Sequence, residues 1–463
     1  MQRTRSSVRF VTQLTERPTS TRLVMAVVAV GVLLSGFDLF IVNVALGDIA
    51  VALGVSDLAD LSWILNAYAI TFAALLVPAG RISDRIGAKR GFLGGLLLFT
   101  AASAACAFAP GLAGLVAFRV VQAAGAALMI PSSLGLVLTA FPPEGRQGAV
   151  RLWAGLGGIG AALGPVVGGV LVHADWRWVF LVNIPTGLVA AFVGWRVLPD
   201  APGDRGRAPG LVGALLLTVT VAALVLVLVN GPEWGWTSGR TLAFAAVTVV
   251  GLALNVAAVT RAADPLVSLD VLRAPHFAST SLTLLTFHVA FGAMLLSIVL
   301  WLQEVWELSA LEAGLAIAPG PLLVPFVAVY GGRLVAAIGP RAVIALGGAV
   351  FAAGVASWAV LAGASTSYAA TVLPGMLLTG VGVGLVVPPS MALGTSELPP
   401  DRRGTGSAVL QTARQVGIAV GVAVLVAVLG AQSPGAEAFE AAWWTTAVFA
   451  LASSVTVMAR EPR

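Results

Sequence analysis

The sequence predicts an all-α membrane protein, built as two similar six-helix bundles with two inserted helices between them, fourteen transmembrane helices in all. Its composition is 58% hydrophobic and 10% charged over 463 residues, whereas about a quarter of a soluble domain is charged. Apolar runs of about 20 residues, long enough to cross a bilayer, recur along the whole chain. A set of glycines and prolines also occurs twice at one fixed offset, which indicates a duplicated fold.

The duplication rests on eight residues that recur 257 positions later. Gly125, Pro131, Ser133, Pro142, Pro143, Arg146, Gly160 and Gly164 are repeated as Gly382, Pro388, Ser390, Pro399, Pro400, Arg403, Gly417 and Gly421. Glycine and proline mark places where the backbone needs a special shape, so repeating them repeats a fold. In a membrane chain, a period this long indicates the duplicated halves of a transporter.

The apolar runs divide the chain into seven parts. We expect a cytoplasmic N-terminal segment (1–22), an N-terminal six-helix bundle (23–198), a cytoplasmic linker (199–210), two inserted transmembrane helices (211–260), a cytoplasmic loop (261–277), a C-terminal six-helix bundle (278–459) and a cytoplasmic tail (460–463). The fourteen predicted spans are 23–47, 61–80, 91–110, 112–139, 151–172, 178–197, 211–229, 241–260, 278–300, 312–332, 341–362, 370–392, 405–430 and 441–459.

The basic residues give these spans an orientation. With the N-terminus inside, 22 of the 26 Lys and Arg residues fall on cytoplasmic segments, as expected for a membrane protein. Both termini are therefore predicted to be cytoplasmic, in a multi-pass protein of the inner (cytoplasmic) membrane. The basic charge needs no nucleic-acid partner to explain it. One cysteine, three histidines and no long polar segment give no sign of a metal site, a cofactor or an enzyme active site.

Four segments resemble a known family. Residues 80–90 read GRISDRIGAKR, 119–125 read RVVQAAG, 160–169 read GAALGPVVGG and 176–185 read WRWVFLVNIP. They resemble signatures of the major facilitator superfamily, specifically its fourteen-span drug:proton antiporters of the QacA/EmrB type. The first span, with DLFIVNVAL at 38–46, is similar to that family's first helix, but Phe40 and Gly47 depart from its pattern and put the usual substrate range in doubt.

The fifth span carries the segment that resembles the antiporter motif. Gly160, Gly164 and Gly168 are spaced four residues apart and form one smooth ridge, next to Pro165 and Gly169. The ridge could serve only the close packing of another helix. Alternatively, Pro165 lets the helix flex while the close packing blocks ion leakage.

The loop after the second span contains Gly80, Asp84, Arg85, Gly87 and Lys89. Its basic residues could serve orientation alone, but orientation does not require an acid among them. We expect Asp84 to accept from Arg85 or to cap a neighbouring helix, locking the outward-open state from the cytoplasmic side. The degenerate second copy has Ala336 in place of the acid, so this latch is predicted on one side only.

Two charges lie inside predicted spans at nearly matching depth, Asp38 in the first and Arg119 in the fourth. A charge within a bilayer costs about 2.5–3.5 kcal/mol on insertion scales, so each calls for a partner or a function. By the family's pattern both helices line the central cavity, where the pair would load and release a proton. Gln122 shares the face of Arg119 and can bond either charge or substrate. A static buried ion pair is the alternative.

The second half has no matching carboxylate. His288, near the middle of the ninth span, is either a proton-coupling residue of the cavity or a neutral histidine bonded to a backbone carbonyl. Arg414, in the inner half of the thirteenth span, is either a structural clamp or a residue with a role in transport.

The resemblance implies secondary active efflux of lipophilic, possibly cationic, small molecules in exchange for protons, by alternating access. The partners would be substrate, protons and the lipid bilayer, the energy source would be the proton motive force, and the protein would work as a monomer. One alternative is the dedicated export of a single endogenous metabolite or natural product. A membrane-embedded enzyme or receptor is a remote one.

Overall fold

A computed structural model describes residues 21–55, 58–200, 203, 211–261, 265–361, 367–399, 402–429 and 436–458. Every regular element in these ranges is a helix, so the all-α prediction is confirmed. The predicted N-terminal segment, most of the 199–210 linker and the C-terminal tail lie outside the described residues.

In the described part of the chain, fourteen positions are occupied by long helices or broken pairs of helices. In order they are α2 (Thr21–Leu53), α3 (Leu58–Ile86), α4 (Ala88–Ala107), α5 (Leu112–Ala140), α6 (Pro143–Ala174), α7 (Trp178–Leu181) with α8 (Asn183–Val197), α9 (Leu211–Trp234), α10 (Gly239–Arg261), α12 (Phe277–Leu300), α13 (Ala310–Ile317) with α14 (Pro319–Ile338), α15 (Pro340–Leu361), α16 (Tyr368–Ser396), α17 (Arg403–Leu429) and α18 (Ala436–Met458). A short helix, α11 (Leu269–Leu272), precedes α12.

The helices fit a multi-pass membrane protein. Within the described residues, thirteen segments are long and apolar enough to cross a bilayer, and the 32-residue helix α6 occupies the remaining predicted span. Some details differ from the prediction. Helix α2 runs to Leu53 rather than 47, the sixth span is broken between α7 and α8, and α12 continues into a π-helix at Trp301–Val305.

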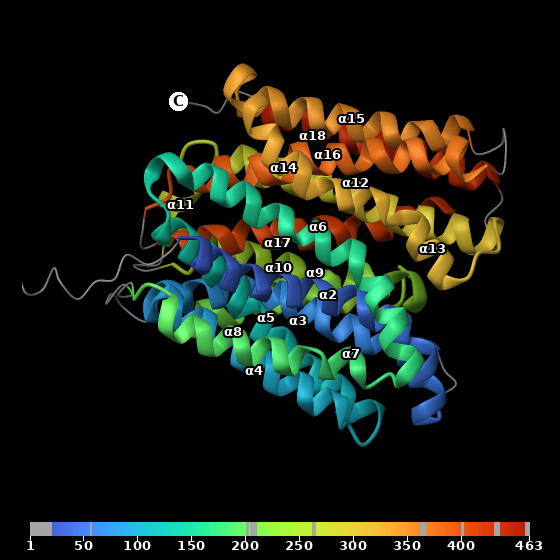
Figure 1. The fold of residues 1–463 in the computed structure, drawn as a ribbon, viewed down its shortest axis with the longest axis horizontal. Helices are drawn as coiled ribbons and strands as arrows, with labels where there is room; N and C mark the ends of the chain where they lie inside the picture. The colour runs from blue at the N-terminus through green and yellow to red at the C-terminus, as the bar shows by residue number, and fades with distance from the viewer. Residues whose placement is uncertain are drawn as a thin grey trace, which may run out of the picture.

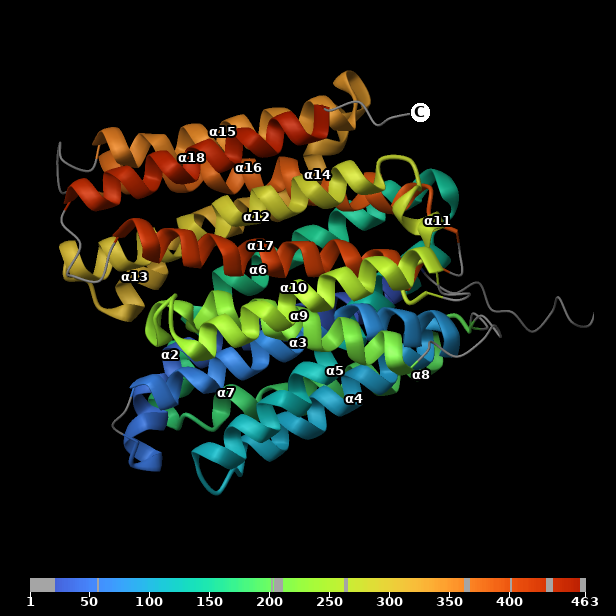
Figure 2. The ribbon, with the colours of Figure 1, turned by 180° about the vertical axis from the view of Figure 1, so that it is seen from behind.

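The helices pack as two groups (Figure 1). In the first, α2 packs on α6 and α5 packs on α3 and α4; in the second, α12 packs on α17 and α15 packs on α16 and α18. Contacts between the groups run mainly through α3 with α17 and α6 with α14 and α16. Helices α9 and α10 pair with each other on the face seen in Figure 2, and α9 touches both α3 and α17. The sequence positions at which these units divide stay a prediction.

The repeated glycines make the same contacts in both groups. A Cβ on Gly125 would lie 2.6 Å from the Phe99 nitrogen on α4, and one on Gly382 would lie 2.6 Å from the Phe351 Cβ on α15. Both positions therefore allow only glycine if the neighbouring helix is to stay close. The repeat in the sequence is a repeat of helix packing.

The tight turns before α4 and α15 are also repeated. Gly87 and Gly339 have positive φ values of 93° and 83°, a conformation that residues with a Cβ rarely adopt. Each glycine ends one helix and allows the next to return at once, so these turns place the two copies of the loop signature in equivalent positions.

Candidate functional site

A buried ion pair joins α2 to α5. Arg119 Nη1 donates to Asp38 Oδ2, and neither side chain is exposed. Arg119 Nε also donates to the Ile64 carbonyl of α3 at 3.1 Å, and the guanidinium lies over the Tyr68 ring, 4.2 Å from its centre. The pairing expected from the depths of the two charges is therefore present, and α3 supplies further contacts that hold the arginine in place.

Gln122 completes this cluster, which we call the acid-base cluster (Asp38, Arg119 and Gln122). Its Nε2 donates to Asp38 Oδ1 at 2.8 Å, and its Oε1 accepts from Arg119 Nη1 at 2.7 Å. Ser103 Oγ on α4 accepts from Gln122 at 2.8 Å and from Asn183 Nδ2 at 3.3 Å. The side-chain amide of Gln122 thus binds both members of the ion pair. Four helices besides α2 supply residues that contact the cluster or its hydrogen-bond partners.

Among the described residues that line the central cavity, α2 and α5 are both represented, but Asp38, Arg119 and Gln122 are not. The cavity wall on α2 is formed by Val32, Ser35 and Gly36. Asp38 lies three residues after the wall residue Ser35, about 60° from it around a helix with 3.6 residues per turn, and its carboxylate meets α5. Its charge is buried where α2 contacts α5, between two apolar clusters, one of which includes Ala123 and the other Leu115.

The glycine ridge of α6 packs against α2 next to Asp38. A Cβ on Gly160 would lie 3.1 Å from Gly36 Cα, and one on Gly168 would lie 3.3 Å from Ile41 Cα. Gly164 is buried on the same helix, and Gly169 is half-buried. The ridge therefore brings the two backbones together, which both interpretations of the motif require; no side-chain contact of Pro165 is described.

Asp84 joins the two groups of helices at the end that carries the basic loops. Its carboxylate accepts from the Gly404 and Thr405 amides at 2.7 and 2.8 Å and from Thr405 Oγ1 at 2.7 Å. These amides begin α17, so Asp84 caps the N-terminus of a helix in the other group. The sequence left two partners open for Asp84, Arg85 and the N-terminus of a neighbouring helix, and the structure shows the second.

Close packing supports this contact, which we call the α3–α17 latch (Gly80, Asp84, Gly404 and Thr405). A Cβ on Gly80 would lie 2.6 Å from the Gly404 carbonyl oxygen. Lys89 makes an ion pair with the exposed Asp200 at 3.2 Å and so ties the loop to its own group of helices.

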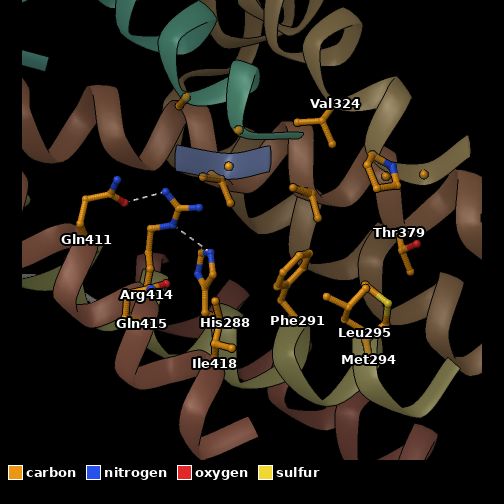
Figure 3. A pocket seen from close by; sticks show the side chains of 18 of the residues that line it. His288, Phe291, Met294, Leu295, Val324, Thr379, Gln411, Arg414, Gln415 and Ile418 are labelled. Atoms are coloured by element: carbon orange, nitrogen blue, oxygen red, sulfur yellow. Dashed lines mark hydrogen bonds between the residues drawn. The ribbon is translucent and has the colours of Figure 1, made fainter. Parts of the chain in front are cut away.

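The central cavity has a volume of about 210 Å³ and lies between the two groups of helices. His288 and Arg414 both line it, and Arg414 Nε donates to His288 Nε2 at 3.0 Å (Figure 3). His288 Nδ1 lies 2.7 Å from the Leu284 carbonyl oxygen. The carbonyl expected for a neutral histidine is present, and the ring is in addition bound to the arginine.

The sequence profile of the Major Facilitator Superfamily matches residues 28–422. This chain belongs to the Major Facilitator Superfamily. A relative, the Multidrug resistance protein Stp of Mycobacterium tuberculosis (strain CDC 1551 / Oshkosh), is 34% identical over 400 residues, which are 86% of this chain and 74% of the relative. The Tetracenomycin C resistance and export protein of Streptomyces glaucescens is 34% identical over 392 residues, 84% of this chain and 72% of the relative.

A solved structure shares the fold of this superfamily member. The human organic anion transporter MFSD10 superposes with a TM-score of 0.69 over 95% of this chain and 99% of the other. The two sequences are 16% identical, so the comparison concerns the fold alone.

Three features of this superfamily member were not predicted from its sequence. Ser103 and Tyr68 belong to the surroundings of the acid-base cluster, and Gln411 accepts from Arg414 Nη1 at 2.6 Å beside the cavity. Gln411 could have been found, since it precedes Arg414 by three residues and so shares its face. Ser103 and Tyr68 lie on other helices, and no signal in the sequence gives the rotation of those helices.

Proposed function

We propose that this protein exports lipophilic small molecules in exchange for protons by alternating access. The acid-base cluster is the observation that carries this proposal. Asp38 and Arg119 are 1% and 0% exposed within helices that are otherwise apolar, and burying such charges is costly unless they serve a function. The names of the two relatives, a multidrug resistance protein and a resistance and export protein, support outward transport.

The cluster would couple proton binding to movement through α2. A proton on Asp38 removes the negative charge that Arg119 Nη1 and Gln122 Nε2 bind, which weakens the link from α2 to α5. About one turn before Asp38, α2 forms part of the cavity wall at Ser35 and Gly36. A shift of α2 on protonation would therefore change the contacts that a molecule bound in the cavity makes with this helix.

The α3–α17 latch would hold the two groups of helices together at the cytoplasmic end. Alternating access then requires the three hydrogen bonds to Asp84 to break in each cycle. Fourteen helical positions, with α9 and α10 outside the two groups, support placement among the fourteen-span antiporters. We further propose a monomer in the cytoplasmic membrane with both termini inside, because the basic residues gather on the corresponding loops.

Dedicated export of one natural product is the second candidate. It is favoured by the relative named for a single compound, tetracenomycin C. A panel of unrelated dyes separates the two candidates, because a dedicated exporter would transport none of them.

The test is dye efflux in inverted membrane vesicles energised with a proton gradient, comparing the wild type with Asp38→Asn. The substitution keeps the size of the side chain and removes the charge. We expect the rate of proton-driven transport to fall at least about 100-fold, because the substitution removes the group that exchanges the proton. The amount of protein in the membrane should stay the same.

Asp175→Asn is the matched control. Asp175 forms an exposed ion pair with Arg177 at 3.5 Å, so its loss should leave transport unchanged. Equal transport by wild type and Asp38→Asn would disprove coupling at the acid-base cluster.

A further inference from the structure

The large polar side chains of the cavity gather on one wall (Figure 3), while the other walls are mainly apolar with the hydroxyl groups of Ser35 and Thr379. Gln411, Arg414 and Gln415 of α17, with His288 of α12, form one wall (Figure 3). Positions 411, 414 and 415 share one helix face because three- and four-residue spacings bring side chains together. Phe291, Met294 and Val324 are among the apolar residues of the other walls.

Arg414 is the only charged residue that lines the cavity among the described residues. Three ion pairs are present in the described part of the chain, and none of them includes Arg414. Its Nε and Nη1 bind His288 and Gln411, while Nη2 has no hydrogen-bond partner there (Figure 3). A guanidinium without a counter-ion inside a membrane protein is costly, so an acidic group that enters the cavity would be stabilised.

His288 and Gln411 hold the arginine in place for such a group. Arginine can only donate, so His288 Nε2 must be an acceptor, and Nδ1 carries the hydrogen that the Leu284 carbonyl accepts. Gln411 uses its oxygen on Arg414, which leaves its NH₂ group as a donor. The wall therefore offers donors and a positive charge, and no carboxylate that could bind a cation.

We propose that the cavity takes molecules with a flat or bulky apolar body and one acidic group, such as a carboxylate or an ionised phenol, and that Arg414 binds that group. This inference deepens the proposed function, on which it rests, and it reverses the expectation of cationic substrates. The acidic group accepts from Arg414 Nη2 and from the Gln411 amide, while the body lies against Phe291 and the other apolar walls.

The test is equilibrium binding of two dyes to the purified, detergent-solubilised protein, measured by fluorescence polarisation. Fluorescein is acidic and rhodamine 123 is cationic, and both are built on the xanthene ring system. We expect the wild type to bind fluorescein at least about tenfold more tightly, which corresponds to one charge-assisted hydrogen bond. Arg414→Gln should weaken fluorescein binding about tenfold or more and leave rhodamine 123 binding unchanged or stronger.

Three further variants separate loss of the binding contact from misfolding, which gel filtration would report. Arg414→Lys keeps the charge and loses the fork of donors, so it should retain the preference for fluorescein with lower affinity. Gln411→Leu removes one donor and should weaken fluorescein binding about threefold to tenfold. Arg177→Gln is the control, because it removes an exposed arginine that does not belong to the cavity wall. It should leave the binding of both dyes unchanged.

The proposal is overturned if the folded wild type binds no fluorescein, if it binds rhodamine 123 as tightly, or if Arg414→Gln weakens both dyes equally. Binding in detergent needs no proton gradient, so this result is separate from the vesicle assay. Loss of proton-driven transport with the fluorescein preference intact would count against antiport and not against the acidic ligand.

Discussion

The two halves of the molecule differ in whether their buried charges line the cavity. In the first half, Asp38 and Arg119 are buried between α2 and α5 and are not among the described residues that line it. In the second half, His288 and Arg414 face the cavity directly. A duplicated scaffold has thus been retained while the position of its polar groups has diverged, which suits a division between proton exchange in one half and ligand contact in the other.

The glycine ridges show which positions correspond. A Cβ on Gly160 would meet Gly36, and one on its repeat, Gly417, would lie 2.9 Å from the His288 Cβ. His288 therefore occupies the place of Gly36, and Asp38 corresponds to Ala290, two residues further along. Ala290 is fully buried and apolar.

The same correspondence extends to the arginines. Met376 is the equivalent of Arg119 in the second half, and Arg414 is the equivalent of Gly157, because each pair is separated by the 257 residues of the repeat. At the cavity, glycines of the first half correspond to His288 and Arg414 of the second half. The buried charges of the first half correspond to the apolar Ala290 and Met376, of which Met376 lines the cavity. Charge placement, and not packing, distinguishes the halves.

The largest expected effect comes from Arg119→Leu, which leaves Asp38 buried without its partner. Breaking a buried ion pair costs about 3–5 kcal/mol of folding free energy. Thermal unfolding in detergent would measure it, with Met376→Leu as the control at the equivalent position, where a volume-conserving exchange costs less than about 1.5 kcal/mol. Equal losses in the two variants would contradict a special role for the first half.

The next effect concerns Asp84→Asn. An amide oxygen still accepts from the start of α17 but carries no charge, and hydrogen bonds to charged groups contribute about 1.5–3 kcal/mol. We expect the two groups of helices to separate more often at the cytoplasmic end. Labelling of a cysteine introduced there would rise at least about tenfold, because 1.4 kcal/mol corresponds to that factor. Unchanged labelling would show that the latch does not set the balance between the two accessible states.

Substitution of alanine for Gly80, and for its equivalent Gly332, tests whether the latch depends on close packing as well as on charge. A Cβ at Gly80 would meet the Gly404 carbonyl at 2.6 Å, whereas at Gly332 it would meet the flexible end of Arg151 at 2.8 Å. Gly80→Ala should therefore destabilise the closed contact by about 1–3 kcal/mol, while Gly332→Ala should have a smaller effect. The same cysteine-labelling assay compares the two variants. An equal rise in labelling would contradict a special role for the contact of Gly80 with α17.

The smallest effect is expected from Ala336→Asp, which places an acid at the position corresponding to Asp84. Ala336 is exposed, so an acid introduced there would stay in contact with solvent instead of being held against the start of α6, the counterpart of α17. Stability should change by less than about 0.5 kcal/mol in thermal unfolding. A clear stabilisation would mean that a second latch can be built.

Much of this arrangement could be predicted from the sequence, and the limits have a physical cause. Repeated glycines predicted the duplicated packing, and the depth of Asp38 and Arg119 predicted their pairing. The rotation of α2 could not be predicted, because a helix that is apolar all round gives no sign of which face meets the cavity. The contact of His288 with Arg414 was missed because it joins helices 126 residues apart.

Helix α9 packs against both of the helices that carry the latch, α3 and α17. Its Val221 and Val225 share an apolar cluster with Ala73 and Ala74 of α3 and Ala419 of α17. Lipid chains therefore cannot reach the α3–α17 seam from this side of the molecule. In the proposed transport cycle, a separation of α3 from α17 would therefore require α9 to move relative to at least one of them.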